Sequence, residues 1–163
     1  MFVGLSKVGY FGTIWIVLSA AISLVTRRNI FPVLLTAGSV WTADLLTLAI
    51  KAGVERQRPS LTVPQADPLM GAGGWSFPSG HAATAFAGAV SLTYLWRRGA
   101  PLFFLLAAAI AFSRVYVGVH YPGDVLAGAA LGTVVGLAWV AALRLPRRSA
   151  EARRQSGAGP PAG

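Results

Sequence analysis

The chain has 163 residues, of which 55% are hydrophobic and 12% are charged, and its mean hydropathy is +0.61. This composition is typical of an integral membrane protein and excludes a soluble domain built on one core. Cysteine is absent, which excludes a disulfide framework and thiolate chemistry, and the net charge of +9 does not indicate nucleic-acid binding because the arginines cluster beside apolar runs.

Five apolar segments follow one another along the chain, and each approaches the ~20 residues that a helix needs to cross a bilayer core of ~30 Å. They lie at about Val8–Val25, Ile30–Ala52, His81–Trp96, Pro101–Gly118 and Asp124–Leu145. The sequence therefore predicts an all-α fold, a polytopic transmembrane helix bundle of five spans that forms one domain over residues 1–145. The first run is interpreted as a retained span, because cleavage as a signal peptide would reverse the topology of the rest.

Positive residues sort to the two sides of these segments. Nine arginines fall on the side that the positive-inside tendency makes cytoplasmic: Arg27, Arg28, Arg97, Arg98, Arg144, Arg147, Arg148, Arg153 and Arg154. The opposite side receives Lys7, Lys51, Arg56, Arg58 and Arg114. We expect a multi-pass protein of the inner or plasma membrane whose C-terminus is cytoplasmic. Residues 146–163 are expected to form a disordered basic tail.

The fifth segment carries a stripe of glycines, Gly128, Gly132 and Gly136, spaced every four residues. This spacing puts a smooth groove on one helix face and permits close backbone approach. Packing within the bundle is the favoured interpretation, and a homodimer through the stripe is the alternative. Asp44 lies near the middle of the second segment, about 10 Å along the helix axis from Lys51, and is expected to form an interhelical hydrogen bond.

The second segment ends in a first group of cations, Lys51 and, seven residues later, Arg58 ahead of Pro59. Side chains of this kind also snorkel at helix ends without any ligand. Arg114 is harder to explain in that way, since it lies inside an apolar run, where a charge is costly unless it is paired or faces water. Guanidinium groups bind phosphate oxygens in bidentate fashion.

Pro78-Ser79-Gly80-His81 immediately precedes the third segment. A turn that leads into a helix offers N–H groups and a positive dipole end, which suit an anion. Ser79 can cap that helix or bind a phosphate oxygen, and Gly80 permits close approach of the backbone. Alone, the motif would indicate no more than a helix cap.

His120 and Asp124 stand four residues apart at the start of the fifth segment. A carboxylate beside an imidazole fixes its tautomer and leaves the other ring nitrogen able to react. Asp124 can equally cap the helix, and the two roles are compatible. We do not expect a zinc site, because Lys51, Arg58 and Arg114 would repel a dication. Three cations around two imidazoles indicate an anionic ligand.

Together the three motifs resemble those of the type 2 phosphatidic acid phosphatases, lipid phosphate phosphatases related to vanadium haloperoxidases and bacterial acid phosphatases. Every specified position of the pattern K-x6-RP, PSGH and SR-x5-H-x3-D is present, in the same order. The resemblance spans roughly residues 30–145. Members of this family usually have six spans, and the span without a counterpart here would be the first, which carries no motif.

The resemblance implies hydrolysis of a lipid phosphate without a metal or other cofactor, through a phosphohistidine intermediate. His120 would be the nucleophile, Asp124 its orienting partner, and His81 the general acid and then the base. The phosphoryl oxygens would be held by Lys51, Arg58, Ser79, Gly80 and Arg114.

Several substrates and two other functions stay open on the sequence. The motifs fit a polyprenyl diphosphate, phosphatidate, phosphatidylglycerophosphate or a polyprenyl-linked phosphoribose phosphate equally well, on the extracytoplasmic side. A phosphate-head-group binder or lipid transporter would use the cations but leave the paired imidazoles without a purpose. A structural membrane subunit would leave all three motifs unexplained. A vanadate-dependent oxidase would share the anion site but lacks an evident oxidation pocket.

Overall fold

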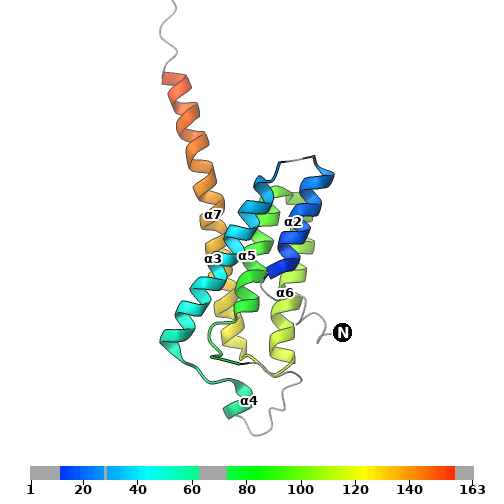
Figure 1. Ribbon diagram of the computed structural model, residues 1–163, viewed down its shortest axis with the longest axis vertical. Coiled ribbons are helices and arrows are strands. Elements are labelled where there is room, and N and C mark those ends of the chain that lie inside the picture. The colour runs from blue at the N-terminus through cyan, green and yellow to red at the C-terminus, as the bar shows by residue number, and fades with distance from the viewer. Residues whose placement is uncertain (1–11, 28, 63–72, 157–163) are drawn as a thin grey trace, which may run out of the picture.

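The computed structural model describes residues 12–27, 29–62 and 73–156, with side chains described as far as Arg144. Within these ranges the chain forms five helices of eight or more residues and no strand (Figure 1). The predicted all-α bundle is confirmed. The long helices are α2 (Thr13–Val25), α3 (Phe31–Val54), α5 (Gly80–Leu95), α6 (Ala100–Tyr116) and α7 (Pro122–Ser156), with short α4 (Pro59–Thr62) and η2 (Arg97–Gly99) between them.

Three stretches are long and apolar enough to cross a membrane: Phe31–Thr62, Arg97–Tyr116 and Pro122–Arg144. The other two predicted spans are helices as well, but shorter than expected. Helix α5 has 16 residues, which is about 24 Å of helix. Helix α2 has 13 residues, and residues 8–11 of the predicted first span lie outside the described part of the chain.

Helix α7 continues past the apolar segment to Ser156, so the expectation of disorder is wrong for residues 146–156. The physical reason is local, since Ala, Arg, Glu and Gln dominate this stretch and are strong helix formers. Residues 157–163 of the predicted tail lie outside the described residues.

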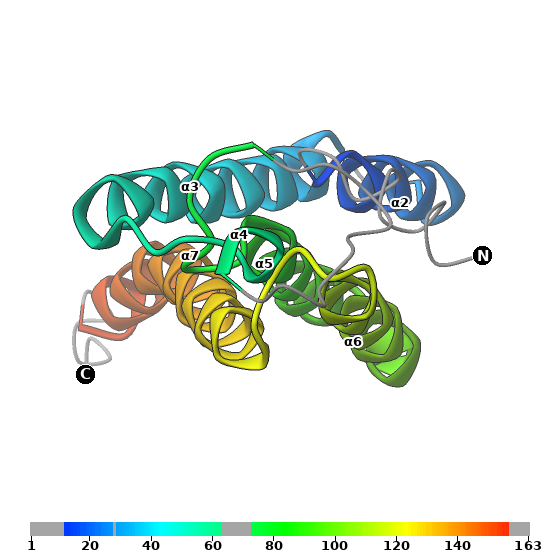
Figure 2. The same ribbon diagram turned by 90° about the horizontal axis from the view of Figure 1, so that it is seen from below.

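Helix α5 is the centre of the bundle. Seen along the bundle in Figure 2, α5 lies between α3 on one side and α6 and α7 on the other, and it packs most extensively against α7. Its sequence explains this position, because small residues occur on every face of the helix and most of its side chains are buried. Neighbouring backbones can therefore approach α5 from several directions.

The glycine stripe of α7 packs against α5 within the same chain. A Cβ atom placed on Gly128 would lie 2.4 Å from Ser79 O, and one on Gly132 would lie 2.0 Å from Ala83 O. At Gly136 the nearest atom would be Val90 Cβ at 2.8 Å. The stripe is covered by α5 of the same chain, as the favoured interpretation predicts, so the groove at these three glycines is filled. A homodimer stays a prediction.

The chain reverses direction so that four helix termini gather at one end of the bundle. Helices α3 and α6 end there, and α5 and α7 begin there, at the lower end of Figure 1. Away from this end, Trp139 of α7 links α7 to α3. Its ring covers Gly38, and its Nε1–H donates a hydrogen bond to Thr42 Oγ1 at 3.1 Å. All three sequence motifs belong to the shared end.

Candidate active site

The turn between α6 and α7 places His120 beside the last turn of α6. Gly118 adopts a φ of 75°, a left-handed conformation that glycine takes at little cost. The N–H groups of Val119 and His120 then both donate to the carbonyl oxygen of Arg114 at 3.3 Å. His120 is thereby fastened to the helix that carries Arg114.

Asp124 caps α7 and faces His120 at the same time. Its Oδ2 accepts a hydrogen bond from the Tyr121 N–H at 2.9 Å. Tyr121 is the residue before the first turn of α7, so this bond caps the start of the helix. The same Oδ2 lies 3.6 Å from His120 Nδ1, and the Ser76 hydroxyl also donates to it. The carboxylate thus caps the helix and faces the imidazole from the same position, and its role in orienting the imidazole stays a prediction.

The tautomer of His120 follows from its neighbours. Arg58 Nη1 lies 3.4 Å from His120 Nε2, and a guanidinium has only donors to offer. Nε2 is therefore the unprotonated nitrogen, and Nδ1 carries the hydrogen, which faces Ser76 Oγ at 3.5 Å and Asp124 Oδ2 at 3.6 Å. Burial, followed by the charges of Arg58 and Lys51, lowers the pKa of His120 far below its ordinary value of 6.5. The imidazole is neutral at neutral pH, with a lone pair directed at Arg58.

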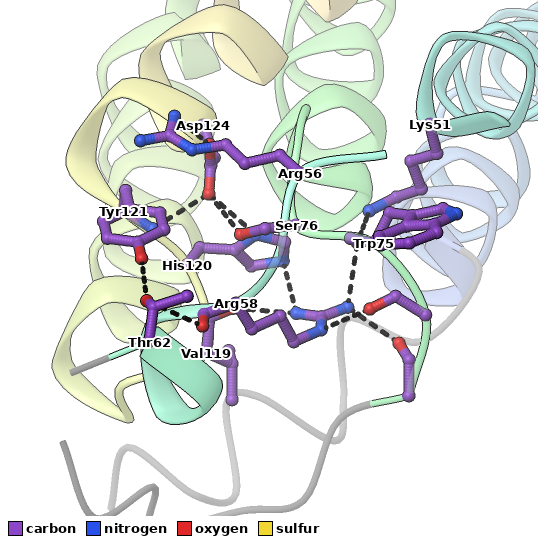
Figure 3. A network of polar contacts seen from close by, with 12 residues as sticks. Lys51, Arg56, Arg58, Thr62, Trp75, Ser76, Val119, His120, Tyr121 and Asp124 are labelled. Carbon is purple, nitrogen blue, oxygen red and sulfur yellow. Dashed lines mark hydrogen bonds and ion pairs between the residues drawn. The ribbon is translucent and has the colours of Figure 1, made fainter. Parts of the chain in front are cut away.

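Lys51 and Arg58 converge on one short segment, Gly73–Trp75, as Figure 3 shows. Lys51 Nζ donates to Trp75 O at 2.6 Å, and Arg58 Nη2 reaches the same oxygen at 3.3 Å. Arg58 also donates to Gly74 O at 3.0 Å, Gly73 O at 2.9 Å and Val119 O at 2.8 Å. The two cations thus lie next to each other and beside His120, held by carbonyl oxygens.

Ser79 and Arg114 carry buried donors that the described residues leave without a hydrogen-bond partner. These are Ser79 Oγ, Arg114 Nε and Arg114 Nη1, on side chains that are almost fully buried. Buried donors of this kind are costly unless a ligand or water satisfies them. Gly80 begins α5 beside Ser79, so the N–H groups of that helix start are close by. The group fits an anion with several oxygens.

His81 is the second residue of α5, and its charge contributes to the lowering of the His120 pKa. The backbone links its helix directly to the third motif, because Ser79 N–H donates to Asp124 O at 2.9 Å. The structure thus brings the three motifs together at one end of the bundle. Asp44 Oδ1 lies close to Gly80, and its interhelical hydrogen bond stays a prediction.

Two residues of this site, Arg56 and Ser76, were not predicted from the sequence. Arg56 donates to Asp124 Oδ1 at 2.9 Å and lies over the Tyr121 ring, with its Cζ 4.2 Å from the ring centroid. Ser76 joins the carboxylate from the long loop. In the sequence, Arg56 looks like one more cation at a helix end and Ser76 like an ordinary loop serine. The pairing with Asp124 depends on contacts across 48 and 68 positions of the chain.

The comparison with known proteins agrees with this geometry. Residues 32–148 match the PAP2 superfamily. The chain belongs to this superfamily. The decaprenylphosphoryl-5-phosphoribose phosphatase of Mycobacterium tuberculosis is 36% identical over 138 residues, which cover 82% of this chain and 73% of the relative.

Two crystal structures of PAP2 proteins share the fold. Aquifex aeolicus LpxE superposes with a TM-score of 0.72 at 27% identity, covering 85% of this chain and 82% of that chain. The first transmembrane PAP2 type phosphatidylglycerolphosphate phosphatase from Bacillus subtilis gives a TM-score of 0.69 at 25% identity, over 86% and 73%. The present PAP2 chain is thus a membrane-spanning phosphatase, and the resemblance seen in its motifs is confirmed. The non-catalytic alternatives find no support in this family.

Proposed function

We propose that this PAP2 protein removes the terminal phosphate of a lipid phosphate through a phosphohistidine formed on His120 Nε2. The observation that supports this most directly is the different surroundings of the two ring nitrogens of His120. Its unprotonated nitrogen faces Arg58, and its other nitrogen faces the carboxylate of Asp124. An imidazole held in this way is an activated nucleophile beside an anion-binding cation.

The first step transfers the phosphoryl group to the enzyme. His120 Nε2 attacks phosphorus in line with the ester oxygen, the P–O bond to the leaving group breaks, and His81 gives that oxygen a proton. Lys51, Arg58 and Arg114 neutralise the charge on the three non-bridging oxygens, with Ser79 Oγ and the start of α5 as further donors. Positioning and charge neutralisation supply most of the catalysis in reactions of this class.

The second step restores the enzyme. His81, now neutral, takes a proton from water while the water oxygen attacks phosphorus, and the P–N bond to His120 breaks. Orthophosphate is released, and His81 is again protonated. Microscopic reversibility assigns one imidazole to both proton transfers, and a general acid or base of this kind contributes roughly 10²–10⁴-fold.

For the substrate, we propose a polyprenyl-linked phosphoribose phosphate. The mycobacterial relative, which is similar over 82% of the chain, is a decaprenylphosphoryl-5-phosphoribose phosphatase. The Bacillus subtilis protein of the same fold is a phosphatidylglycerolphosphate phosphatase, so the phosphoribose lipid is taken from the relative that is more similar in sequence. The lipid tail would stay in the bilayer, since exposed apolar side chains such as Trp41, Leu45 and Leu48 cover the outer face of α3.

We further propose that the site faces the extracytoplasmic side. Lys51, Arg56, Arg58 and Arg114 belong to the site end of the bundle, and each is tied to the machinery described above. Arg27, Arg97 and Arg98 belong to helix ends at the opposite side, and Arg144 stands at the far end of the apolar span of α7. Arginines that serve no site are expected to mark the cytoplasmic side.

The test is hydrolysis by the detergent-purified protein with a chelator present. Release of orthophosphate would be compared among a polyprenylphosphoryl-phosphoribose phosphate, phosphatidylglycerophosphate, a polyprenyl diphosphate, phosphatidate and soluble phosphoribose. We expect the first lipid to give the highest kcat/KM, His120→Ala to abolish turnover, and Arg98→Gln, an exposed change at the other end, to leave it unaltered.

Particular results would overturn separate parts of the proposal. Hydrolysis that persists in His120→Ala, or that requires a divalent metal, contradicts the mechanism. Equal kcat/KM for soluble phosphoribose contradicts a lipid substrate, and a preference for another lipid replaces the phosphoribose assignment. A phosphoenzyme trapped from labelled substrate under alkaline quench, and missing in His120→Ala, would identify the intermediate directly.

A further inference from the structure

We propose that Arg56 is a positioning residue of the phosphatase site, holding the Asp124 carboxylate in the orientation in which it faces His120. This inference rests on the proposed function and extends it to a residue outside the three motif patterns. Arg56 would act through Asp124 and not through contact with phosphate.

The two oxygens of Asp124 have different partners. Arg56 Nη1 donates to Oδ1 at 2.9 Å, whereas Oδ2 receives the Tyr121 N–H and the Ser76 hydroxyl and faces His120 Nδ1. Arg56 is the cation that forms an ion pair with this carboxylate among the described residues. Both oxygens are engaged by side chains or backbone on different sides (Figure 3), which restrains rotation of the carboxylate plane away from the imidazole.

Burial makes this ion pair necessary. The side chain of Asp124 is 0% exposed, whereas that of Arg56 is 43% exposed. A buried carboxylate that loses its cation is left with an uncompensated charge, and its movement toward water would take it away from the Nδ1 hydrogen of His120. Because Arg56 itself stays partly in water, the cost of burying the second charge is small.

The guanidinium of Arg56 is held on two sides. One side is the ion pair with Asp124, and the other is the Tyr121 ring at 4.2 Å. Tyr121 is fixed in turn, because its hydroxyl and Thr62 Oγ1 share a hydrogen bond. A planar cation can stack and donate at once, which a lysine ammonium cannot do equally well. The site therefore favours arginine over another cation.

Arg56 and Arg58 lie on opposite sides of the imidazole. Arg58 approaches Nε2, the nitrogen that attacks phosphorus, at 3.4 Å. Arg56 approaches the carboxylate that faces Nδ1. Loss of Arg58 should therefore weaken phosphate binding, whereas loss of the Arg56 side chain should slow the chemical step and leave phosphate binding intact.

The main chain of Arg56 has a separate role that a substitution leaves in place. Its carbonyl oxygen accepts the Ser76 N–H at 2.7 Å, which anchors the serine whose hydroxyl bonds Asp124. A side-chain variant thus tests the ion pair without removing the loop anchor.

The experiment compares Arg56→Gln and Arg56→Lys with wild type and with Arg98→Gln, an exposed arginine at the other end. For Arg56→Gln we expect kcat to fall about 10–100-fold, by analogy with the loss seen when the outer partners that orient metal-ligating histidines are removed. KM and the inhibition constant of inorganic phosphate should change by less than about 2-fold, because Arg56 does not contact the phosphate and substrate binding in the ground state is retained. Arg56→Lys, which keeps the charge without the stacking, should recover part of kcat.

A double variant separates positioning from other effects. In the Asp124→Asn background, Arg56→Gln should cause no further loss, because the carboxylate that it orients is gone. Additive losses overturn the proposal, as does a rise in KM or in the phosphate inhibition constant at unchanged kcat, which would make Arg56 a substrate contact. Thermal unfolding in detergent checks that each variant is folded. If Arg56→Gln does not fold, the kcat and KM of Arg56→Lys are used to test the positioning role.

The same assay distinguishes this inference from the proposed function. If wild type fails to hydrolyse every lipid phosphate of the panel, the proposed function fails and the inference falls with it. If wild type is active and Arg56→Gln matches it, the inference alone is wrong.

Discussion

Substitution of Gly132 by alanine tests how closely α7 must approach α5. The added Cβ would lie 2.0 Å from Ala83 O and 2.8 Å from the Ala83 carbonyl carbon, whereas ordinary contact begins at 3.4 Å. A backbone carbonyl cannot rotate aside as a flexible side chain can. The contact must therefore open by more than 1 Å, from 2.0 Å to 3.4 Å, and the two helices must separate locally.

The expected size of the effect follows from two opposing contributions. Overpacking of a well-packed interface costs typically ~1–3 kcal/mol, and the preference of a helix for alanine over glycine returns up to ~1 kcal/mol. We expect a net loss of about 1–2 kcal/mol, which corresponds to a fall in Tm of ~2–8 °C for a chain of this size. Helix α7 carries Asp124 and α5 carries His81, so activity should fall as well, by as much as ~10²-fold for a displacement of ~1 Å.

Gly53→Ala is the matched control, because Gly53 is also a helical glycine but has nothing within 4 Å of its added Cβ. Thermal unfolding followed by tryptophan fluorescence in detergent, together with orthophosphate release, measures both variants. Gly53→Ala should keep the wild-type activity, and its Tm should stay the same or rise slightly, because the helix preference for alanine acts there without a clash. If Gly132→Ala behaves like Gly53→Ala, the helices are not in the contact that the structure shows, and the explanation of the glycine stripe is wrong.

Two further predictions concern charge in the site. Arg58→Lys cannot reproduce the four carbonyl contacts at Gly73, Gly74, Trp75 and Val119, so we expect a fall of roughly 10²-fold in kcat/KM and weaker inhibition by inorganic phosphate; unchanged phosphate inhibition would contradict its role. The pKa of His120 is lowered in the folded chain, so the unfolded chain binds the extra proton and stability should fall as pH drops below about 6.5, by up to ~1.4 kcal/mol per pH unit. In Tm measurements from about pH 7.5 to about pH 5, His120→Gln should show a smaller fall in Tm below about pH 6.5 than wild type. Equal slopes of Tm against pH for the two proteins would refute the lowered pKa of His120.

The motifs alone were enough to predict the family and the bundle. Apolar runs of span length predict helices whatever the tertiary contacts are, because the backbone of a membrane segment must satisfy its own hydrogen bonds. His120 and Asp124 are close in sequence at a helix start, so their pairing could also be predicted locally. The helix that continues after Leu145 differs from the predicted disorder, because Ala, Arg, Glu and Gln favour a helix there although the tail is rich in charge and ends in Gly and Pro.

What only the tertiary structure decided is which distant residues meet. The carboxylate of Asp124 is held by Arg56 and Ser76, 68 and 48 positions away in the chain, and nothing in the local sequence distinguishes these two from other loop residues. The same holds for the glycine stripe, whose spacing predicts a contact face but not its partner. Local patterns determine where helices form and which side chains can react, whereas the packing of α7 on α5 selects the neighbours that orient them, because that selection depends on backbone approach between segments far apart in the sequence.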